Sequence, residues 1–275
     1  MILVIVVHYG QNLKILKRCV YSFLKNEKNI KFLIVNNNNS QLKKSNLIQD
    51  PRLSILNSGK NLGYGGGFNL VLDTKLFRDA TSVLLVNNDT YISAPILNLL
   101  ENELKNQEIG IVGPVVEFIK NGVKMYDMGG YINGKIGYTY HKETKKIQGK
   151  RAILVDFLGV CLLIKKDLLK KIKGFDKDFF LYYEDVDFCL RGRRIGFKTV
   201  VVPTTVIFHE LSKAVGKDSK LAVYNQTKSA VLYMKKHLGL RRILFLSYLI
   251  LQSAKRFVNN PSTGIYAFKA IFEEI

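Results

Sequence analysis

The stretch "ILVIVVHYGQNLKILKRCVYSFLKNEKNIKFLIVNN" occupies residues 2–37 and decides the architecture of the chain. Its first run, residues 2–7, is apolar throughout, which is typical of a buried strand. Apolar residues then recur at helical spacing over residues 12–25, before a second buried strand at 31–35. Two fully apolar strands joined by a helix indicate neighbours in a parallel sheet that is covered on both faces.

The same alternation continues along the chain, with short pieces separated by Gly and Asn between about 114 and 156, where we expect antiparallel hairpins. We predict an α/β fold: a Rossmann-like, mostly parallel central sheet flanked by helices, a small antiparallel insertion and a helical C-terminal tail. Further strands are expected at 53–56, 82–86, 109–113, 159–164 and 198–202, and further helices at about 66–78, 95–106, 166–172 and 184–195.

Composition restricts the partners. The chain of 275 residues has 42 Lys and Arg against 22 Asp and Glu, a formal net charge of +20, so we expect an anionic partner such as nucleic acid, an acidic membrane surface or a phosphorylated substrate. Three cysteines without metal-binding spacing are expected to be buried free thiols, which fits a reducing cytoplasm. The first residues lack the basic region and cleavage site of a signal peptide. The sequence also contains no run of about 20 uninterrupted apolar residues, the length that a membrane-spanning helix needs.

Polar motifs follow the ends of the predicted strands, where ligands of such sheets bind. "NNNNS" (36–40), "NSGKNLGYGGGFN" (57–69) and "NNDT" (87–90) each follow one strand. The glycine cluster would let backbone N–H groups approach a ligand, although a flexible turn before a helix is the plainer alternative. It matches neither the dinucleotide-binding fingerprint nor the P-loop.

Asp89 places one carboxylate just beyond a buried strand. Mg²⁺ or Mn²⁺ takes oxygen ligands and often keeps several from a substrate phosphate, so Asp89 with a diphosphate would form a reasonable site. The alternative is a turn or a helix cap before Pro95. His209 could complete the site because Mn²⁺ accepts imidazole, although a lone histidine is more often packed or hydrogen-bonded.

The stretch "FDKDFFLYYEDVDFCLRGRRIGF" (175–197) gathers five acids in this basic chain. Glu184 and Asp185 are expected at the start of a helix, where acids interact well with the helix dipole, and Asp187 can pair with Arg191. The preceding aromatic run "FFLYY" could wall off water beside a carboxylate and raise its pKa, or could be ordinary core.

Taken in order, these motifs resemble a known family. "VNNNNS", "NLGYGGGFN", "NND", "GVCLLI" and "GFDKDFFLYYEDVDFCLR", followed by "RIGFKTVVVP" and a histidine, are similar to family 2 glycosyltransferases of GT-A fold, and within them to the rhamnosyltransferase-like members that build bacterial surface polysaccharides. The resemblance spans about residues 2–212. It implies an inverting transfer of a sugar, with rhamnose a candidate, from a nucleotide-diphosphate donor to a hydroxyl of a glycan or lipid-linked acceptor.

The resemblance also implies roles for individual residues. Asp89 matches the metal-binding Asp and His209 a histidine that joins Mg²⁺ or Mn²⁺, while Asp185 matches the catalytic base with Glu184 beside it. Asn36 or Asn37 and Asn87 stand where the family usually has Asp. Donor-binding positions are Asn36, Asn37, Asn61, Gly63, Gly66, Gly67, Asn69, Asn87 and Asn88, and Tyr183 and Asp187 belong to the acceptor side.

Residues 1–213 are accordingly expected to form the GT-A catalytic domain and residues 214–275 a basic helical extension. "HLGLRRILFLSYLILQSAKRF" (237–257) has a short apolar centre flanked by Arg and Lys, which suits a helix lying on anionic lipid at the inner face of the cell membrane. Packing on the catalytic domain or in a homodimer interface is the alternative.

Two other functions fit the sequence less well. A non-catalytic module that binds membrane or nucleic acid would use the positive charge, but no basic-aromatic groove is evident, and we expect no nucleic-acid partner. A nucleotidyltransferase would need a basic glycine-rich loop after the first strand, which "HYGQNLK" (8–14) matches poorly.

Overall fold

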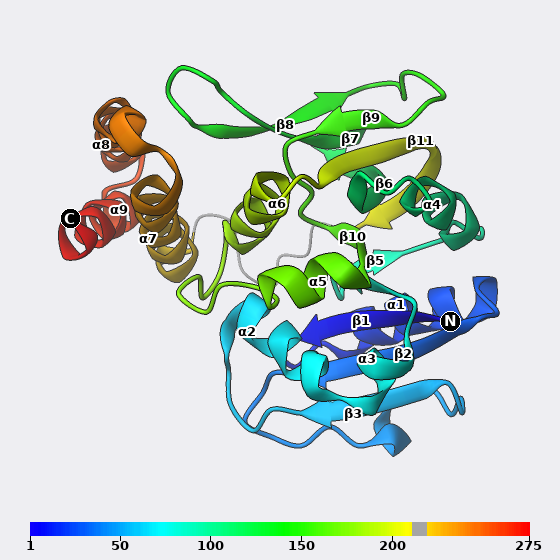
Figure 1. Ribbon diagram of the computed structural model, residues 1–275. Helices are drawn as coiled ribbons and strands as arrows, with labels where there is room; N and C mark the ends of the chain where they lie inside the picture. The colour runs from blue at the N-terminus through cyan, green and yellow to red at the C-terminus, as the bar shows by residue number, and fades with distance from the viewer. Residues whose placement is uncertain (211–218) are drawn as a thin grey trace.

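A mixed sheet of eleven described strands forms the centre of the molecule (Figure 1). The structure is a computed structural model that describes residues 1–210 and 219–275. The main path of the sheet runs β3-β2-β1-β4-β10-β6-β11-β5. The strands on this path are β1 (Ile2–His8), β2 (Ile30–Asn36), β3 (Leu53–Asn57), β4 (Ser82–Val86), β5 (Thr90–Tyr91), β6 (Ile109–Lys120), β10 (Cys161–Lys165) and β11 (Lys198–His209).

Most neighbours on this path are parallel, as predicted. β1 pairs in parallel with β2 and β4, β2 with β3, and β6 with β11. β10 is the exception inside the sheet, because it runs antiparallel to both β4 and β6. Its first residue, Cys161, therefore lies opposite Val86, the last residue of β4. This reversal brings the start of β10 to the same sheet edge as the ends of β1 and β4.

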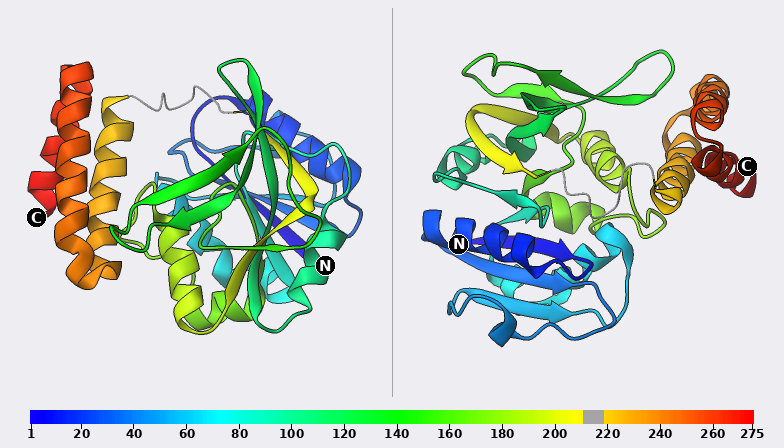
Figure 2. Two further views of the ribbon diagram at one scale, coloured as in Figure 1. Left: turned by 90° about the horizontal axis from the view of Figure 1, so that it is seen from above. Right: turned by 180° about the vertical axis from the view of Figure 1, so that it is seen from behind.

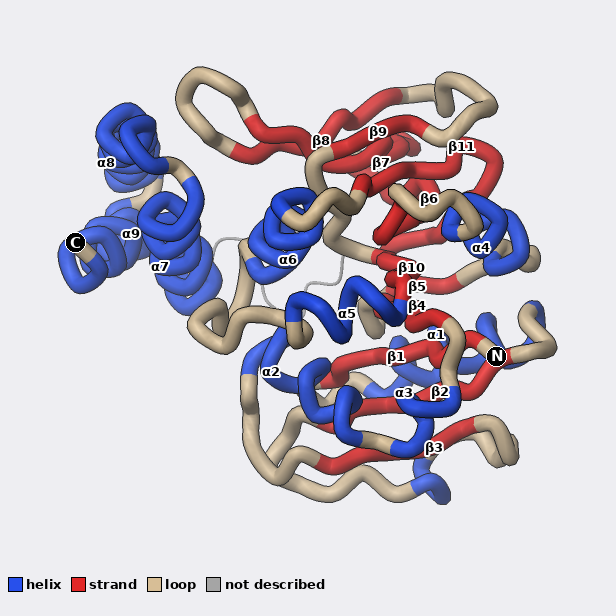
Figure 3. The backbone as a smooth tube through the Cα atoms, viewed as in Figure 1, coloured by secondary structure: helices blue, strands red, loops and turns tan. Residues whose placement is uncertain are grey.

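Helices cover both faces of the sheet, and alternate strand residues point to each face (Figure 3). In β1, Leu3, Ile5 and Val7 belong to one apolar core and Ile2, Val4 and Val6 to the other. The first core packs against α2 (Gly63–Asn69), α5 (Lys166–Ile172) and α6 (Glu184–Arg194), and the second against α1 (Leu13–Asn26) and α4 (Leu97–Leu104). Double coverage explains why the strands are uninterrupted apolar runs.

The antiparallel insertion consists of the second half of β6 with β7 (Val123–Ile132) and β8 (Thr139–Thr144), while β9 (Ile153–Val155) pairs with β11. The hairpins expected between residues 114 and 156 are thus confirmed. The strand expected to end at Gly113 instead continues to Lys120, because the residues after Pro114 pair with β7 and β11.

The helix expected at residues 66–78 is instead three short pieces: α2, the 3₁₀ turn η2 (Leu70–Asp73) and α3 (Lys75–Asp79). Thr74 separates the last two, because its backbone is extended and its side chain accepts a hydrogen bond from the Phe77 amide as a helix cap. The remaining short element outside the tail is η1 (Lys44–Asn46).

The tail contains α7 (Lys220–His237), η4 (Gly239–Arg241), α8 (Arg242–Asn259) and α9 (Pro261–Glu274), which stand side by side at one end of the molecule (Figure 2). α7 packs on the sheet domain: Tyr233 is fully buried and its hydroxyl donates to the Gly137 carbonyl at 2.8 Å. The expected domain boundary at residues 213 and 214 lies outside the described residues.

A backbone contact joins α2 to the segment before α6. The Tyr64 amide donates to the Phe180 carbonyl at 3.0 Å, and a Cβ added to Gly63 would lie 2.1 Å from that oxygen. Gly63 also has a φ of +75°, which side chains disfavour. Glycine is therefore required at this position both by backbone conformation and by space.

Gly59 offers a matched control, because its φ is +72° and a Cβ there would meet nothing within 4 Å. We expect Gly59→Ala to lower the free energy of unfolding by about 1 kcal/mol, from the backbone conformation alone. Gly63→Ala should lower it by about 3 kcal/mol, because overpacking is added. Urea denaturation of the two variants measures the difference, and equal losses would contradict the contact.

Candidate functional site

Polar residues from several elements meet at the sheet edge where β1 and β4 end and β10 begins. His8 is the last residue of β1, and Asn87, Asn88 and Asp89 follow β4. The Asn87 amide donates to the Val160 carbonyl at 3.1 Å, which fixes the turn after β4 against the loop before β10. The sequence placed these motifs at strand ends, and the antiparallel course of β10 adds Gly159 and Val160 to them.

Asn36 and Asn37 are both buried, with 2% of each exposed, and their amides bind other loops of the protein. Asn36 Nδ2 donates to the Ser40 carbonyl and to Asn57 Oδ1, both at 2.7 Å. Asn37 Nδ2 donates to Asn61 Oδ1 at 3.1 Å and to the Gly63 carbonyl at 2.9 Å. These bonds hold the loops after β2 and β3 to the start of α2. The expected donor-binding role of Asn36, Asn37 and Asn61 stays a prediction.

The glycines of α2 face protein. A Cβ on Gly65 would lie 2.7 Å from the Phe175 side chain, and one on Gly67 would lie 2.9 Å from Val7. Asn69 is bonded to Phe175 on both sides, accepting from its amide at 2.9 Å and donating to its carbonyl at 2.8 Å. The observed role of this motif is close packing against the segment before α6, and ligand contact by Gly63, Gly66, Gly67 or Asn69 stays a prediction.

Asp89 and His209 lie together, as the resemblance implied, because β5 pairs with the end of β11 and sets Thr90 opposite His209. Asp89 Oδ1 and His209 Nε2 are 3.1 Å apart, and both side chains are largely buried. Two ligands on adjacent vertices of an octahedron with metal bonds of about 2.1 Å are about 3 Å apart. Within the residues that the structure describes, no group of three such side chains could hold a metal, so a metal here would need further ligands such as water or substrate oxygens.

Glu184 and Asp185 begin α6, as predicted, directly after two residues with left-handed backbone. Tyr182 and Tyr183 have φ values of 69° and 62°, which are costly for aromatic residues and mark a constrained turn. Glu184 is buried, and burial together with the neighbouring charge of Asp185 raises its pKa to about 8. No residue in the described ranges 1–210 and 219–275 makes a hydrogen bond to Glu184 Oε2.

Asp185 faces the loop before β10. Its Oδ1 accepts from the Val186 amide at 2.8 Å, and a Cβ added to Gly159 would lie 2.6 Å from its Oδ2. Burial raises the pKa of Asp185, while the Val186 amide and the charge of His141 act in the opposite direction. The two adjacent carboxyls are therefore held in different environments.

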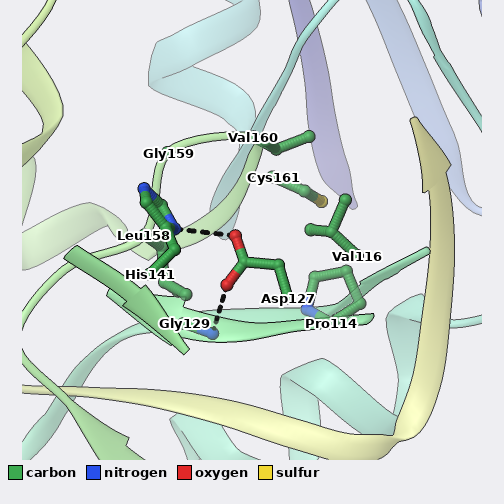
Figure 4. Close-up of a pocket in the computed structure, with 9 residues that line it drawn as sticks. All are labelled: Pro114, Val116, Asp127, Gly129, His141, Leu158, Gly159, Val160 and Cys161. Atoms are coloured by element: carbon green, nitrogen blue, oxygen red, sulfur yellow. Dashed lines mark hydrogen bonds and ion pairs between the residues drawn. The ribbon is translucent and has the colours of Figure 1, made fainter. Parts of the chain in front are cut away.

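A second pair, His141 of β8 and Asp127 of β7, lines a small pocket beside this loop (Figure 4). His141 Nδ1 is 2.7 Å from Asp127 Oδ2, while the Gly129 amide donates to Asp127 Oδ1 at 2.8 Å. Burial alone would lower the pKa of His141, but the hydrogen bond and charge of Asp127 outweigh it and raise that pKa. The charge of Asp185 also acts to raise it, so the imidazole is paired with Asp127 and lies near Asp185.

Tyr64 lies near both acidic groups, Asp89 on one hand and Glu184 with Asp185 on the other. Its hydroxyl donates to Asn87 Oδ1 at 2.9 Å. Burial, followed by the charges of Glu184, Asp185 and Asp89, raises its pKa well above the ordinary value. The residues after β4 and the start of α6 therefore border one common site.

Two expected acceptor-side residues have internal partners. Asp187 is 1% exposed, with Oδ2 2.7 Å from Arg191 Nε and Oδ1 2.8 Å from His237 Nε2, which favours a structural role in joining α6 to α7. The predicted pairing of Asp187 with Arg191 is confirmed. The Tyr183 hydroxyl accepts from Thr139 and its ring packs on Tyr233.

The sequence analysis missed four residues of the site: His8, Tyr64, Asp127 and His141. His8 and Tyr64 lie within motifs that were recognised, and a buried imidazole at a strand end was the available signal for His8, whose Nε2 has no hydrogen-bond partner among the described residues. Asp127 and His141 gave no local signal, because only the pairing of β7 with β8 brings them together.

Comparisons with known proteins give the same family that the sequence motifs resemble. Residues 2–233 match the family described as "Glycosyltransferase like family 2". N-acetylglucosaminyl-diphospho-decaprenol L-rhamnosyltransferase of Mycobacterium tuberculosis is 23% identical over 214 residues, 69% of each chain. The dTDP-rhamnosyl transferase RfbF of Shigella flexneri is 20% identical over 255 residues, 88% of this chain and 84% of RfbF.

A solved structure, GalNAc-T7 with UDP, GalNAc and Mn²⁺, superposes with a TM-score of 0.63 at 11% identity and covers 84% of this chain. The chain spans about half of that structure, 49%, and the likeness shows the GT-A fold. The enzyme class predicted from the motifs is confirmed by the family match and by relatives named as glycosyltransferases. The chain belongs to glycosyltransferase-like family 2.

Proposed function

We propose that this glycosyltransferase moves a sugar from a nucleotide diphosphate to a hydroxyl of a glycan or lipid-linked acceptor, with inversion at the anomeric carbon. The observation that carries the proposal is that two acidic groups, Asp89 with His209 and Glu184 with Asp185, both lie near Tyr64. Rhamnose is the first candidate sugar, because two relatives are named as rhamnosyltransferases.

The donor side would be built around Asp89 and His209. Their carboxylate and imidazole suit Mg²⁺ or Mn²⁺, and their 3.1 Å separation fits adjacent positions around one ion. Such an ion, when bound, would neutralise the charge that develops on a diphosphate leaving group. The Tyr64 hydroxyl donates to Asn87, so Tyr64 would position the turn that carries Asp89.

The acceptor side would be built around Asp185. A base must take the proton of the attacking hydroxyl on the face opposite the leaving group. The raised pKa of Glu184 favours its protonated form near neutral pH, so of the two adjacent acids Asp185 is the better placed to remain charged. His141, itself held by Asp127, would stabilise that charge.

The most direct test of this function is a panel of nucleotide-sugars, including dTDP-rhamnose, UDP-galactose and UDP-glucose, scored for hydrolysis and for transfer by the purified protein. Turnover of one donor above the others would support the proposal. A product that retains the donor's anomeric configuration would count against a single displacement.

We extend the proposal to an anionic membrane surface as the place of reaction. No helix in the described part of the chain is long and apolar enough to cross a membrane. The turn η4 and the start of α8 nevertheless expose apolar side chains beside basic ones. Leu240 is 93% and Ile243 68% exposed, next to Arg241 and Arg242. Apolar residues bordered by arginine suit an interfacial helix on anionic lipid.

For the membrane, we expect the full chain to sediment with vesicles that contain phosphatidylglycerol and to stay in the supernatant with phosphatidylcholine vesicles. Ile243→Glu should weaken this binding, because it places a negative charge on the apolar surface. Absence of binding to both vesicles, together with a dimer in light scattering, would assign the surface to a second copy.

For the donor side, we expect Asp89→Ala to lose Mn²⁺ binding and to reduce transfer by about 100-fold or more, because the metal site loses its only carboxylate among the described residues. Asp73→Ala, which changes an exposed carboxylate in η2, is the control and should behave as wild type. Calorimetry with Mn²⁺ and a transfer assay measure both effects. Full activity of Asp89→Ala in excess EDTA would end the metal proposal.

For the acceptor side, Asp185→Asn keeps the shape and removes the base, so kcat should fall by about 100-fold or more while the KM for the donor changes little. Asp178→Asn alters an acid of the same stretch that pairs with Lys236, and it should retain normal kcat. Normal turnover of Asp185→Asn together with an inactive Glu184→Gln variant would assign the base to Glu184.

Glu184 should also leave a signature in stability. In the folded protein it keeps its proton up to about pH 8, whereas in the unfolded chain it loses the proton near its ordinary pKa of 4.5. Between these values the folded state holds one extra proton, so each pH unit costs at most about 1.4 kcal/mol of the free energy of unfolding. Stability is thus lost as the pH rises from about 4.5 to about 8.

We therefore expect Glu184→Gln to gain stability relative to wild type between pH 5 and pH 8, as measured by urea denaturation at several pH values. Glu103→Gln on α4 should follow the wild-type curve and serves as the control. A Glu184→Gln curve parallel to wild type would show that the carboxyl is not protonated in the folded state.

A further inference from the structure

A second, larger cavity of about 400 Å³ lies where α6 and α7 end, beside the turn after β7. It is lined by three arginines, Arg193 and Arg194 at the end of α6 and Arg241 in η4, with Asp156 as its acid. Arg193 is eight residues along α6 from Asp185, which corresponds to about 12 Å of helix rise. The cavity is therefore separate from the site around Tyr64.

The charge of this cavity is not cancelled by its own contacts. Arg193 Nη1 is paired with Asp156 at 2.5 Å. Arg194 instead donates to His237 Nδ1 at 2.8 Å, and Arg241 donates to the Gly134 carbonyl at 3.1 Å. Both of these acceptors are uncharged when His237 donates through Nε2 to Asp187, so two guanidinium charges remain in excess.

The contacts also hold the guanidinium groups in place before any ligand arrives. Each guanidinium has five N–H donors, so anchoring through one of them leaves others for a ligand. Groups that are already ordered lose less conformational entropy on binding than free surface side chains. Arg194 and Arg241 are exposed residues that these hydrogen bonds restrain, so the cavity offers two charged forks that suit phosphate oxygens.

The lining also includes apolar residues, among them Ile132, Leu190 and Leu238. The volume lies in the range of small-molecule sites and exceeds what a bare phosphate ion needs. We infer that this cavity binds a phosphate monoester or diphosphate that carries an organic group. Because Arg241 directly precedes α8, the phosphate could belong to a membrane lipid or to a free organophosphate.

The test is calorimetric titration of the full chain with pyrophosphate and with glycerol 1-phosphate, in EDTA so that no metal occupies the Asp89–His209 pair. We expect binding that weakens at least tenfold in Arg241→Gln and further in Arg194→Gln/Arg241→Gln. Arg242→Gln removes the adjacent charge, which is not part of the cavity lining, and should stay within twofold of wild type. Circular dichroism checks that each variant is folded, and Arg241→Lys gives a folded comparison that keeps the charge if the double variant fails.

The source of the phosphate is resolved by a second arm with phosphatidic acid in phosphatidylcholine vesicles. Greater sensitivity to Arg241→Gln than to Arg242→Gln in the vesicle arm identifies a lipid phosphate, and the same pattern with the free anions alone identifies a free organophosphate. Equal effects of Arg241→Gln and Arg242→Gln in both arms, or no binding of any phosphate, would overturn the inference. These outcomes are independent of the transfer activity proposed above.

Discussion

The close approach of α2 to the segment before α6 is the constraint on which the site depends. The Phe180 carbonyl occupies the space that a side chain at residue 63 would fill, and Asn69 holds both backbone groups of Phe175. Glycine at four positions of a seven-residue helix is otherwise unfavourable, so packing must compensate for the lost helix propensity. This contact between α2 and the segment before α6 sets the start of α6 beside the turn that follows β4.

The same contact between α2 and the segment before α6 also explains why a chain with a net charge of +20 gathers carboxylates at one place. Asp89, Glu184 and Asp185 all act on Tyr64, and burial makes several like charges there costly. Each acid has a local compensation: His209 lies at Asp89, His141 is paired with Asp127 and lies near Asp185, and Glu184 has a pKa that favours its neutral form. Metal and substrate would add to this balance in the proposed reaction.

Much of the fold could be predicted because buried parallel strands have uninterrupted apolar sequences and their ends are marked by polar turns. The break at Thr74 could not, because a capping threonine also fits within a helix until its backbone is seen. The pairing of Asp127 with His141 depends on strand register, and the arginine cavity depends on how α7 docks, and neither leaves a periodic signal. The sequence predicts ligand contacts for the asparagines and glycines; the structure shows their contacts within the protein, and ligand contact stays a prediction.

The central claim is that one site, bordered by the turn after β4 and the start of α6, holds the donor and the catalytic acids together. A crystal structure of the protein with dTDP and Mn²⁺, with the metal located by anomalous scattering, tests it most directly. The account predicts Mn²⁺ at Asp89 and His209, with the diphosphate on the side that faces Tyr64 and Asp185. Mn²⁺ and nucleotide bound together elsewhere on the molecule would contradict it.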